Sequence, residues 1–163
     1  MKTIYLAGGC FWGTQQYLRQ FRGVVSTLVG YANGRTEAPS YEDVCHKDTG
    51  HAETVRVEYD ETVLPTAALL ETYFLSIDPL SVNRQGGDAG TQYRTGIYYD
   101  DESLLPDILA AAAKLEAGLG RKCAVELLPL TGFWPAEDYH QDYLLKHPDG
   151  YCHIPKSLLH MEA

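Results

Sequence analysis

The sequence predicts an α+β protein with a mainly antiparallel sheet and helices packed against it. Apolar or alternating stretches typical of strands lie at residues 2–7, 24–31, 53–59 and 95–99. Segments with apolar residues three and four positions apart, typical of amphipathic helices, lie between some of these strands. The resulting order is β-α-β-β-α-β-α-β. Its first six elements match the split β-α-β core of ferredoxin-like folds.

The first half of the chain contributes most of this core. Residues 12–21 are predicted to form a helix directly after the first strand, and Asn33-Gly34 indicates a turn after the second. Residues 40–50 are polar and are expected to form a loop. Pro65 opens the next helix, because the first helical position does not need its N–H group.

The second half begins with a long segment that lacks periodicity. Residues 78–94 are polar and rich in glycine, and a loop of this length in a small domain is usually functional. An amphipathic helix is predicted from residue 104 to 115, a strand over 123–128 and a final helix over 137–146. From His147 onward we expect an extended C-terminal tail.

Composition limits the possible partners. The 163 residues carry a formal net charge of −9 and show no basic stripe, which argues against binding to nucleic acid or anionic membranes. No apolar run approaches the ~18 residues of a membrane span. The apolar start of the chain is about five residues long, too short for a signal peptide. We therefore expect one domain over residues 1–163 that works as a cytoplasmic monomer.

Cys10 is the first candidate for chemistry. It follows Gly8-Gly9, which suit a tight turn, and it stands where a strand gives way to a helix. A helix N-terminus lowers the pKa of a thiol, so this setting predicts an exposed, reactive nucleophile. The ordinary alternative is a small buried apolar residue. Phe11 and Trp12 are either core residues or the walls of an apolar pocket, and the sequence leaves both open.

Four further residues have polar groups suited to catalysis. Glu53 opens an alternating strand, and an inward-facing carboxyl there would have a raised pKa and could act as a general acid. A solvated glutamate at a strand end is the ordinary alternative. Tyr41 and Tyr93 lie in loops beside carboxylates. Asp88 lies among glycines, but no Lys-Ser/Thr follows as a phosphate-binding loop requires.

Five motifs together resemble the A-type peptide methionine sulfoxide reductases. They are GCFW at 9–12, YEDVC at 41–45, TGHAE at 49–53, NRQGGDAGTQYR at 83–94 and YHQDYL at 139–144. They occur in order and at compatible spacing along nearly the whole chain. The resemblance implies an oxidoreductase that converts methionine S-sulfoxide, free or in proteins, to methionine.

The resemblance also implies a role for each candidate residue. Cys10 is the nucleophile that becomes a sulfenic acid, and Cys152 resolves it as a disulfide that a thioredoxin-like reductant or dithiothreitol reduces. No bound cofactor or metal is implied. At the apolar end of the substrate, the resemblance implies that Phe11 and Trp12 hold the S-methyl group. At the oxygen, it implies that Glu53 donates the proton and that Tyr41 and Tyr93 donate hydrogen bonds. A buried Asp88 is implied to organise the site.

Two alternatives come from other classes of protein. A zinc-stabilised binding module would use Cys45-His46 and Cys152-His153, although neither pair has the spacing of a structural zinc site. A cysteine hydrolase would pair Cys10 with His51. Neither alternative accounts for an aromatic pair after the cysteine together with Glu53. Cys45 and Cys123 are expected to be structural.

Overall fold

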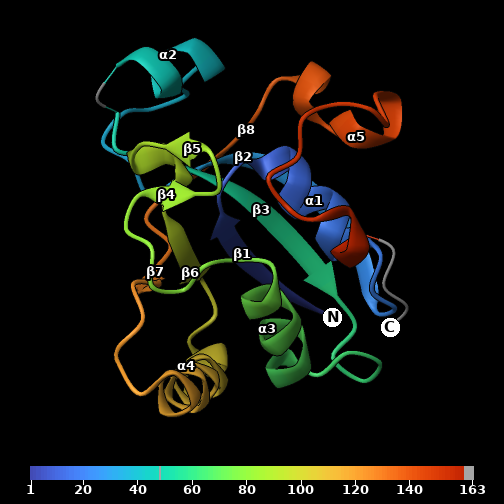
Figure 1. Ribbon diagram of the computed structural model, residues 1–163, viewed down its shortest axis with the longest axis vertical. Helices are drawn as coiled ribbons and strands as arrows, with labels where there is room; N and C mark the ends of the chain where they lie inside the picture. Colours follow the sequence, from blue (N-terminus) through green and yellow to red (C-terminus); the bar gives the residue numbers. More distant parts are fainter. Residues whose placement is uncertain (48, 160–163) are drawn as a thin grey trace.

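The computed structural model describes residues 1–47 and 49–159, and a six-stranded sheet forms its centre (Figure 1). The strands of this sheet are β1 (Lys2–Gly8), β2 (Val24–Ala32), β3 (Ala52–Tyr59), β6 (Thr95–Tyr99), β7 (Glu126–Pro129) and β8 (Phe133–Pro135). A separate two-stranded hairpin consists of β4 (Arg84–Gln85) and β5 (Asp88–Ala89).

Five α-helices accompany the strands in the described part of the chain. They are α1 (Phe11–Arg19), α2 (Tyr41–His46), α3 (Thr66–Leu75), α4 (Leu105–Leu119) and α5 (Tyr143–Lys146). Single 3₁₀ turns occur at Thr91–Tyr93, Glu102–Leu104, Asp138–His140 and Lys156–Leu158. Over residues 1–47 and 49–159, no helix combines the length and apolar character needed to cross a bilayer.

The strand order is β7-β6-β1-β3-β2-β8. Each neighbouring pair is antiparallel except β6 with β7, which are parallel. The expected class, a mixed fold with a mostly antiparallel sheet and helices, is confirmed. β1 and β3 lie at the centre of the sheet, and both Cys10 and Glu53 adjoin these two strands.

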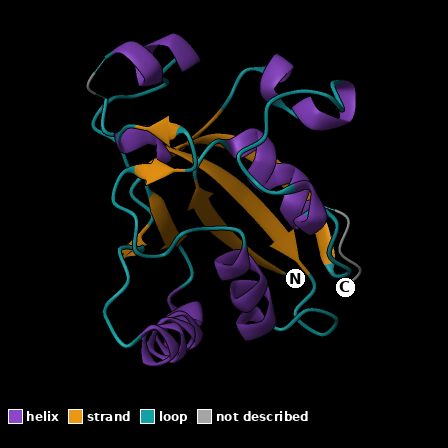
Figure 2. Ribbon diagram, viewed as in Figure 1, coloured by secondary structure: helices purple, strands orange, loops and turns teal. Residues whose placement is uncertain are grey.

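One face of the sheet is covered by helices, as Figure 2 shows. Side chains alternate along β1, so Ile4 and Leu6 join the large core under the helices, while Tyr5 and Ala7 join a smaller cluster on the opposite face. The same alternation along β3 directs Glu53 to the helix-covered face, together with Val55, Val57 and Tyr59, which belong to the large core. Of the two alternatives that the sequence leaves open for Glu53, the structure has the inward-facing one.

A helix and a strand outside the long loop at residues 78–94 were missing from the sequence prediction. Residues 41–46 form the short helix α2, which begins at a capping box between Ser40 and Asp43. The strand β8 pairs with the end of β2, and Trp134 lies opposite Tyr31. A three-residue strand that contains proline has no periodic signal, because its pairing depends on distant residues.

The prediction of a single helix over residues 137–146 is wrong, because this segment is not one continuous helix. It is divided into a 3₁₀ turn and α5 because Asp142 has a φ of +55°. Two side chains of α1 hold Asp142 in this conformation: Arg19 makes an ion pair of 2.7 Å with it, and the Gln15 amide oxygen accepts its backbone N–H at 3.0 Å. The predicted strand 123–128 is also shorter, since β7 begins only at Glu126.

Candidate active site

Cys10 stands at the junction between β1 and α1, and two glycines shape that junction. Gly9 has a φ of +89°, and a Cβ there would lie 2.8 Å from Nε2 of His153. A Cβ on Gly8 would lie 2.9 Å from the side chain of Ile77. Cys10 is the N-cap residue of α1. The strand, turn and helix predicted around Cys10 are therefore present.

The Cys10 thiol is buried, with only 8% of the residue exposed. Burial raises its pKa well above the usual range, the Glu53 charge raises it further, and the backbone N–H of Trp12 lowers it. The expectation of an exposed thiol with a lowered pKa is wrong, because desolvation outweighs the single N–H donor of the helix. In the substrate-free protein Cys10 therefore keeps its proton at neutral pH.

Glu53 is a neutral acid beside this thiol. It is 1% exposed, and burial is the main reason its pKa is raised to about 8. The backbone N–H of Phe11 donates a hydrogen bond of 3.2 Å to Oε1. The second oxygen, Oε2, is buried and has no partner within the described residues. Glu53 thus holds a proton at pH 7 with one oxygen free for another molecule.

Two phenols adjoin Glu53. Burial raises the pKa of Tyr41 and of Tyr93, and the charge of Glu53 adds to the effect in both cases. Tyr41 also makes a side-chain hydrogen bond with Cys45, which in turn interacts with Gln92. Both phenols remain protonated at neutral pH and can donate hydrogen bonds. The structure therefore brings together the predicted residues Cys10, Glu53, Tyr41 and Tyr93.

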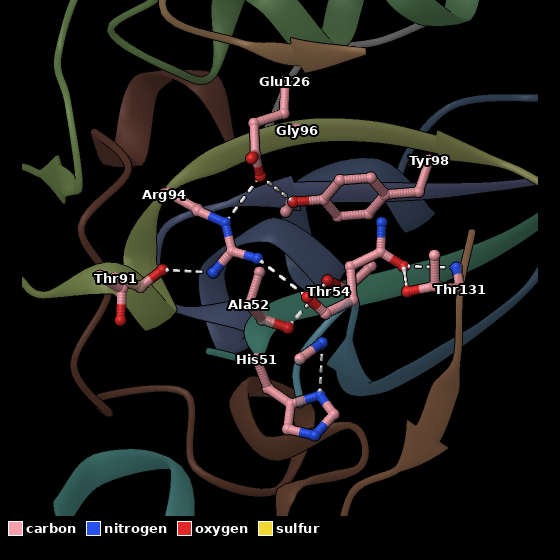
Figure 3. A network of polar contacts seen from close by, with 12 residues as sticks. His51, Ala52, Thr54, Thr91, Arg94, Gly96, Tyr98, Glu126 and Thr131 are labelled. Carbon is pink, nitrogen blue, oxygen red and sulfur yellow. Dashed lines mark hydrogen bonds and ion pairs between the residues drawn. The ribbon is translucent and has the colours of Figure 1, made fainter. Parts of the chain in front are cut away.

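A polar network fixes the turn that carries Tyr93 (Figure 3). The Arg94 guanidinium donates to Oε1 of Glu126 at 2.6 Å and to the carbonyl of Thr91 at 2.9 Å. Its third nitrogen reaches the carbonyl of Asn33 at 3.4 Å. Planar guanidinium groups join several acceptors in this way. The network ties the 3₁₀ turn Thr91–Tyr93 to β7 and to the loop after β2.

Asp88 differs from its expected place. It lies on β5 and is half-buried, not buried. The Tyr151 hydroxyl donates a 3.0 Å hydrogen bond to its Oδ2. Its negative charge raises the pKa of both Cys10 and Glu53. Asp88 therefore acts on the site through charge and links the β4-β5 hairpin to the C-terminal segment.

The two aromatic residues after Cys10 have different surroundings. Phe11 is 1% exposed, and its ring centroid lies 5.7 Å from that of Tyr31 in the large core. Trp12 is half-buried and stacks on Tyr143, with ring centroids 3.8 Å apart. Its indole N–H donates to Nδ1 of His140 at 2.9 Å. Trp12 thus has a fixed orientation and a partly open surface.

Cys152 packs directly against the start of α1. A Cβ on Gly13 would lie 2.8 Å from its sulfur, so only glycine leaves room for the thiol there. The Cys152 charge is among those that raise the pKa of Cys10. The next residue, His153, donates from Nε2 to the Gly8 carbonyl at 2.8 Å. The C-terminal segment therefore carries Cys152 to the Cys10 site.

The alternative sites are not assembled. His51 is occupied on both ring nitrogens: Nδ1 accepts the N–H of Gly34 at 3.1 Å, and Nε2 donates to the Thr36 carbonyl at 2.7 Å. It is therefore not free to act as a base for Cys10. No group of three or more His, Cys, Asp or Glu side chains is arranged to hold a metal ion among the described residues.

The comparisons with known proteins agree with this geometry. The family model described as "Peptide methionine sulfoxide reductase" matches residues 2–162. This chain belongs to the peptide methionine sulfoxide reductase family. A peptide methionine sulfoxide reductase of Lachnoclostridium phytofermentans is 55% identical over 94% of this chain and 92% of its own. The family resemblance and the enzyme class predicted from the sequence are confirmed.

Solved structures of family members share the fold. Reduced Mxr1 of Saccharomyces cerevisiae matches with a TM-score of 0.87 and 38% identity, over 93% of this chain and 88% of that one. Mxr1 in complex with Trx2 matches with a TM-score of 0.61 and 26% identity, over 87% and 84%. The present structure thus has a higher TM-score with the reduced form than with the complex.

The sequence analysis missed three residues that surround the reductase site. His140 and Tyr143, which hold Trp12, lie within the YHQDYL motif but carry no separate signal. His153 was considered only as a zinc ligand. Their contacts with Gly8 of β1 and with Trp12 of α1 join segments more than 120 positions apart, and nothing in the local sequence predicts such pairings.

Proposed function

We propose that this enzyme reduces methionine S-sulfoxide, free or in proteins, through Cys10, and that Glu53 supplies the proton for the substrate oxygen. The observation that carries the proposal is a buried carboxylic acid, protonated at neutral pH, beside a cysteine at a helix start. A sulfoxide oxygen is a hydrogen-bond acceptor that leaves sulfur readily only when it is protonated. General acids typically contribute ~10²–10⁴-fold to such steps.

The proton balance suits this pair. Cys10 sulfur bonds to the substrate sulfur while Glu53 gives its proton to the oxygen, and Glu53 then recovers a proton from the Cys10 thiol. The hydroxyl then passes from the substrate sulfur to the Cys10 sulfur as the S–S bond breaks, so methionine leaves and Cys10 carries the oxygen as a sulfenic acid. Tyr41 and Tyr93 donate hydrogen bonds to the oxygen as its charge develops. Thiol plus sulfoxide gives sulfenic acid plus thioether, so no external proton is consumed.

The apolar end of the substrate is assigned to the aromatic pair. Trp12 presents a half-buried ring held by Tyr143 and His140, and Phe11 closes the core behind Cys10. These rings are suited to the S-methyl group, because burying a methyl-sized group in such a pocket contributes ~1–3 kcal/mol to specificity. Asp88 organises the other side of the site through its charge.

Recycling is assigned to Cys152. Its thiol attacks the sulfenic sulfur of Cys10, which forms a disulfide and releases water. Cys152 also lines a surface pocket of about 280 Å³ with Leu144 and Ile154, which supports access by an external dithiol. Thioredoxin or dithiothreitol then reduces the disulfide. The reducing equivalents come from that dithiol, so the balanced cycle uses no bound cofactor or metal.

The wider setting follows from the same chemistry. We propose a single catalytic domain over residues 1–163 that works as a monomer in the cytoplasm, where dithiol reductants keep thiols reduced. The antiparallel order β6-β1-β3-β2 supports a ferredoxin-like split β-α-β core. The segment after α5 is the C-terminal tail that carries the resolving cysteine.

Incubation with separated methionine sulfoxide epimers and dithiothreitol tests the function. The S epimer should be converted to methionine by the enzyme and should remain unchanged with Cys10→Ser. An alcohol is a far weaker nucleophile than a thiol, so the variant is the matched control. Equal loss of both epimers, or activity that survives Cys10→Ser, would refute the proposed chemistry.

A further inference from the structure

His153 follows Cys152 in the chain and packs against the turn that leads to Cys10. Its ring covers the turn before α1: a Cβ on Gly9 would lie 2.8 Å from Nε2, and a Cβ on Gly13 would lie 3.2 Å from Nδ1. Cys10 stands between these two glycines in the chain. The same Gly13 position lies 2.8 Å from the Cys152 sulfur. Nδ1 of His153 and the Cys152 sulfur therefore lie over the same point of α1.

The hydrogen bonding of His153 defines which nitrogen carries the proton. A carbonyl oxygen only accepts, so the 2.8 Å bond to Gly8 requires the proton on Nε2. Burial lowers the pKa of the imidazole, which keeps it neutral at pH 7. Nδ1 is then an unprotonated acceptor. It is buried, and no partner for it exists within the described residues.

The proposed cycle creates a need for such an acceptor. Burial raises the pKa of the Cys152 thiol, and no cation is among the groups that shift it. A thiol attacks slowly compared with a thiolate, so its proton must be removed as the disulfide forms. The backbone N–H of Ile154 is the main group that lowers this pKa.

Resting on the proposed function, we infer that His153 is the general base for disulfide formation: its Nδ1 takes the Cys152 thiol proton and passes it to the departing oxygen. The Cys152 sulfur forms a bond to the Cys10 sulfur, and the S–O bond of the sulfenic acid breaks. The hydroxyl leaves as water with the transferred proton. The Cys152 sulfur is oxidised and the Cys10 sulfur is reduced, so no further reagent is needed.

Several ionisable groups surround His153 and enter any pH profile. They are Asp88 on the β4-β5 hairpin, Tyr151 and Cys152 on its own segment, and Cys10, which follows the Gly9 position that the ring covers. Of these, Asp88 raises the pKa of His153 and also that of Cys152. The base and the thiol thus share one nearby negative charge.

The decisive variant is His153→Gln. The glutamine amide nitrogen reaches the place of Nε2 and keeps a donor for the Gly8 carbonyl, but an amide cannot take a proton. After one equivalent of methionine sulfoxide is mixed with the reduced enzyme, methionine release and thiol loss are followed in quenched samples. The matched control is His46→Gln, which removes an exposed histidine at the end of α2.

Methionine release should be unchanged in His153→Gln, whereas disulfide formation should slow by about 10-fold or more at pH 7. The deficit should shrink as the pH rises toward the pKa of the Cys152 thiol, because hydroxide then removes the proton. Added imidazole should restore the rate in His153→Ala. If disulfide formation is slowed equally at every pH, His153 only positions the tail. If the rate of disulfide formation is unchanged, His153 is not the general base.

The same measurement separates this inference from the proposed function. If neither wild type nor variant releases methionine, the proposed reaction itself fails. If His153→Gln slows methionine release as much as disulfide formation, the base serves Cys10 and the assignment to Cys152 is overturned.

Discussion

Replacing Glu53 by glutamine removes the acidic proton from the active site and leaves its shape. The amide oxygen of Gln can still accept the N–H of Phe11, which now lies 3.2 Å from Oε1. The volume is unchanged, so the core under the helices should persist. At pH 7 the rate of methionine formation is expected to fall by ~10²-fold or more, since an amide is no general acid.

The pH dependence of the two proteins should differ as well. With a pKa of about 8, Glu53 is mostly protonated at pH 7 and half ionised near pH 8. Single-turnover methionine formation by the wild type should therefore fall tenfold per pH unit above that value. The rate of Glu53→Gln should be low and should not change at this pKa.

The stability of the wild type should also fall as the pH rises. The folded-state pKa of about 8 exceeds the ordinary 4.5, so the stabilising contribution of neutral Glu53 is full below pH 4.5 and is lost as the pH rises through about 8. At 1.36 kcal/mol per pKa unit, the wild type loses about 3 kcal/mol between pH 5 and pH 8 from this group. Glu53→Gln is free of that loss.

Urea unfolding at pH 5 and pH 8, with the thiols kept reduced, measures this difference. The free energy of unfolding of Glu53→Gln relative to wild type should increase by about 3 kcal/mol across the interval. A constant difference would mean that Glu53 ionises at its ordinary pKa. A wild-type rate of methionine formation in the variant would remove Glu53 from the mechanism.

Three further predictions concern neighbouring contacts. Cys152→Ser should form about one methionine per enzyme and then stop with thioredoxin; continued turnover would refute its role as the resolving cysteine. Trp12→Phe loses the hydrogen bond to His140 but keeps a ring, so kcat/KM should fall by less than in Trp12→Ala; equal losses would show that the indole N–H does all the positioning. Gly13→Ala places a methyl group 2.8 Å from the resolving sulfur and should slow disulfide formation, while Gly118→Ala, with open space around it, should leave the rate unchanged; equal rates would show that the tail adapts.

The central fold could be predicted because its signals are local. The alternating strand from Glu53 to Tyr59 and the amphipathic helix α4 have periods that a single segment reveals. β8 and the break at Asp142 were missed for a physical reason. Each depends on partners far along the chain, Tyr31 for Trp134 and Arg19 for Asp142.

In the functional site, too, local features could be predicted from the sequence and features that depend on distant residues could not. Strand alternation allows Glu53 to face either inward or outward, and the structure shows that it faces inward. The ionisation of Cys10 could not be predicted, because the sequence shows the helix start but not how much of the surrounding protein covers the thiol. That cover includes His153, which is 143 positions away and approaches the turn at Gly9.

Burial of both Cys10 and Glu53 is consistent with a reaction between neutral molecules. A lone buried thiolate would be costly here, since desolvation opposes it and an ionised Glu53 would oppose it further. Thiol, carboxylic acid and sulfoxide are all uncharged before the reaction, and sulfenic acid, carboxylic acid and thioether are uncharged after it. Charge develops only while the oxygen is being transferred, beside Glu53 and the two phenols. An apolar site therefore opposes ionisation of the resting groups without opposing the overall reaction, and its few donors are concentrated where the transient charge appears.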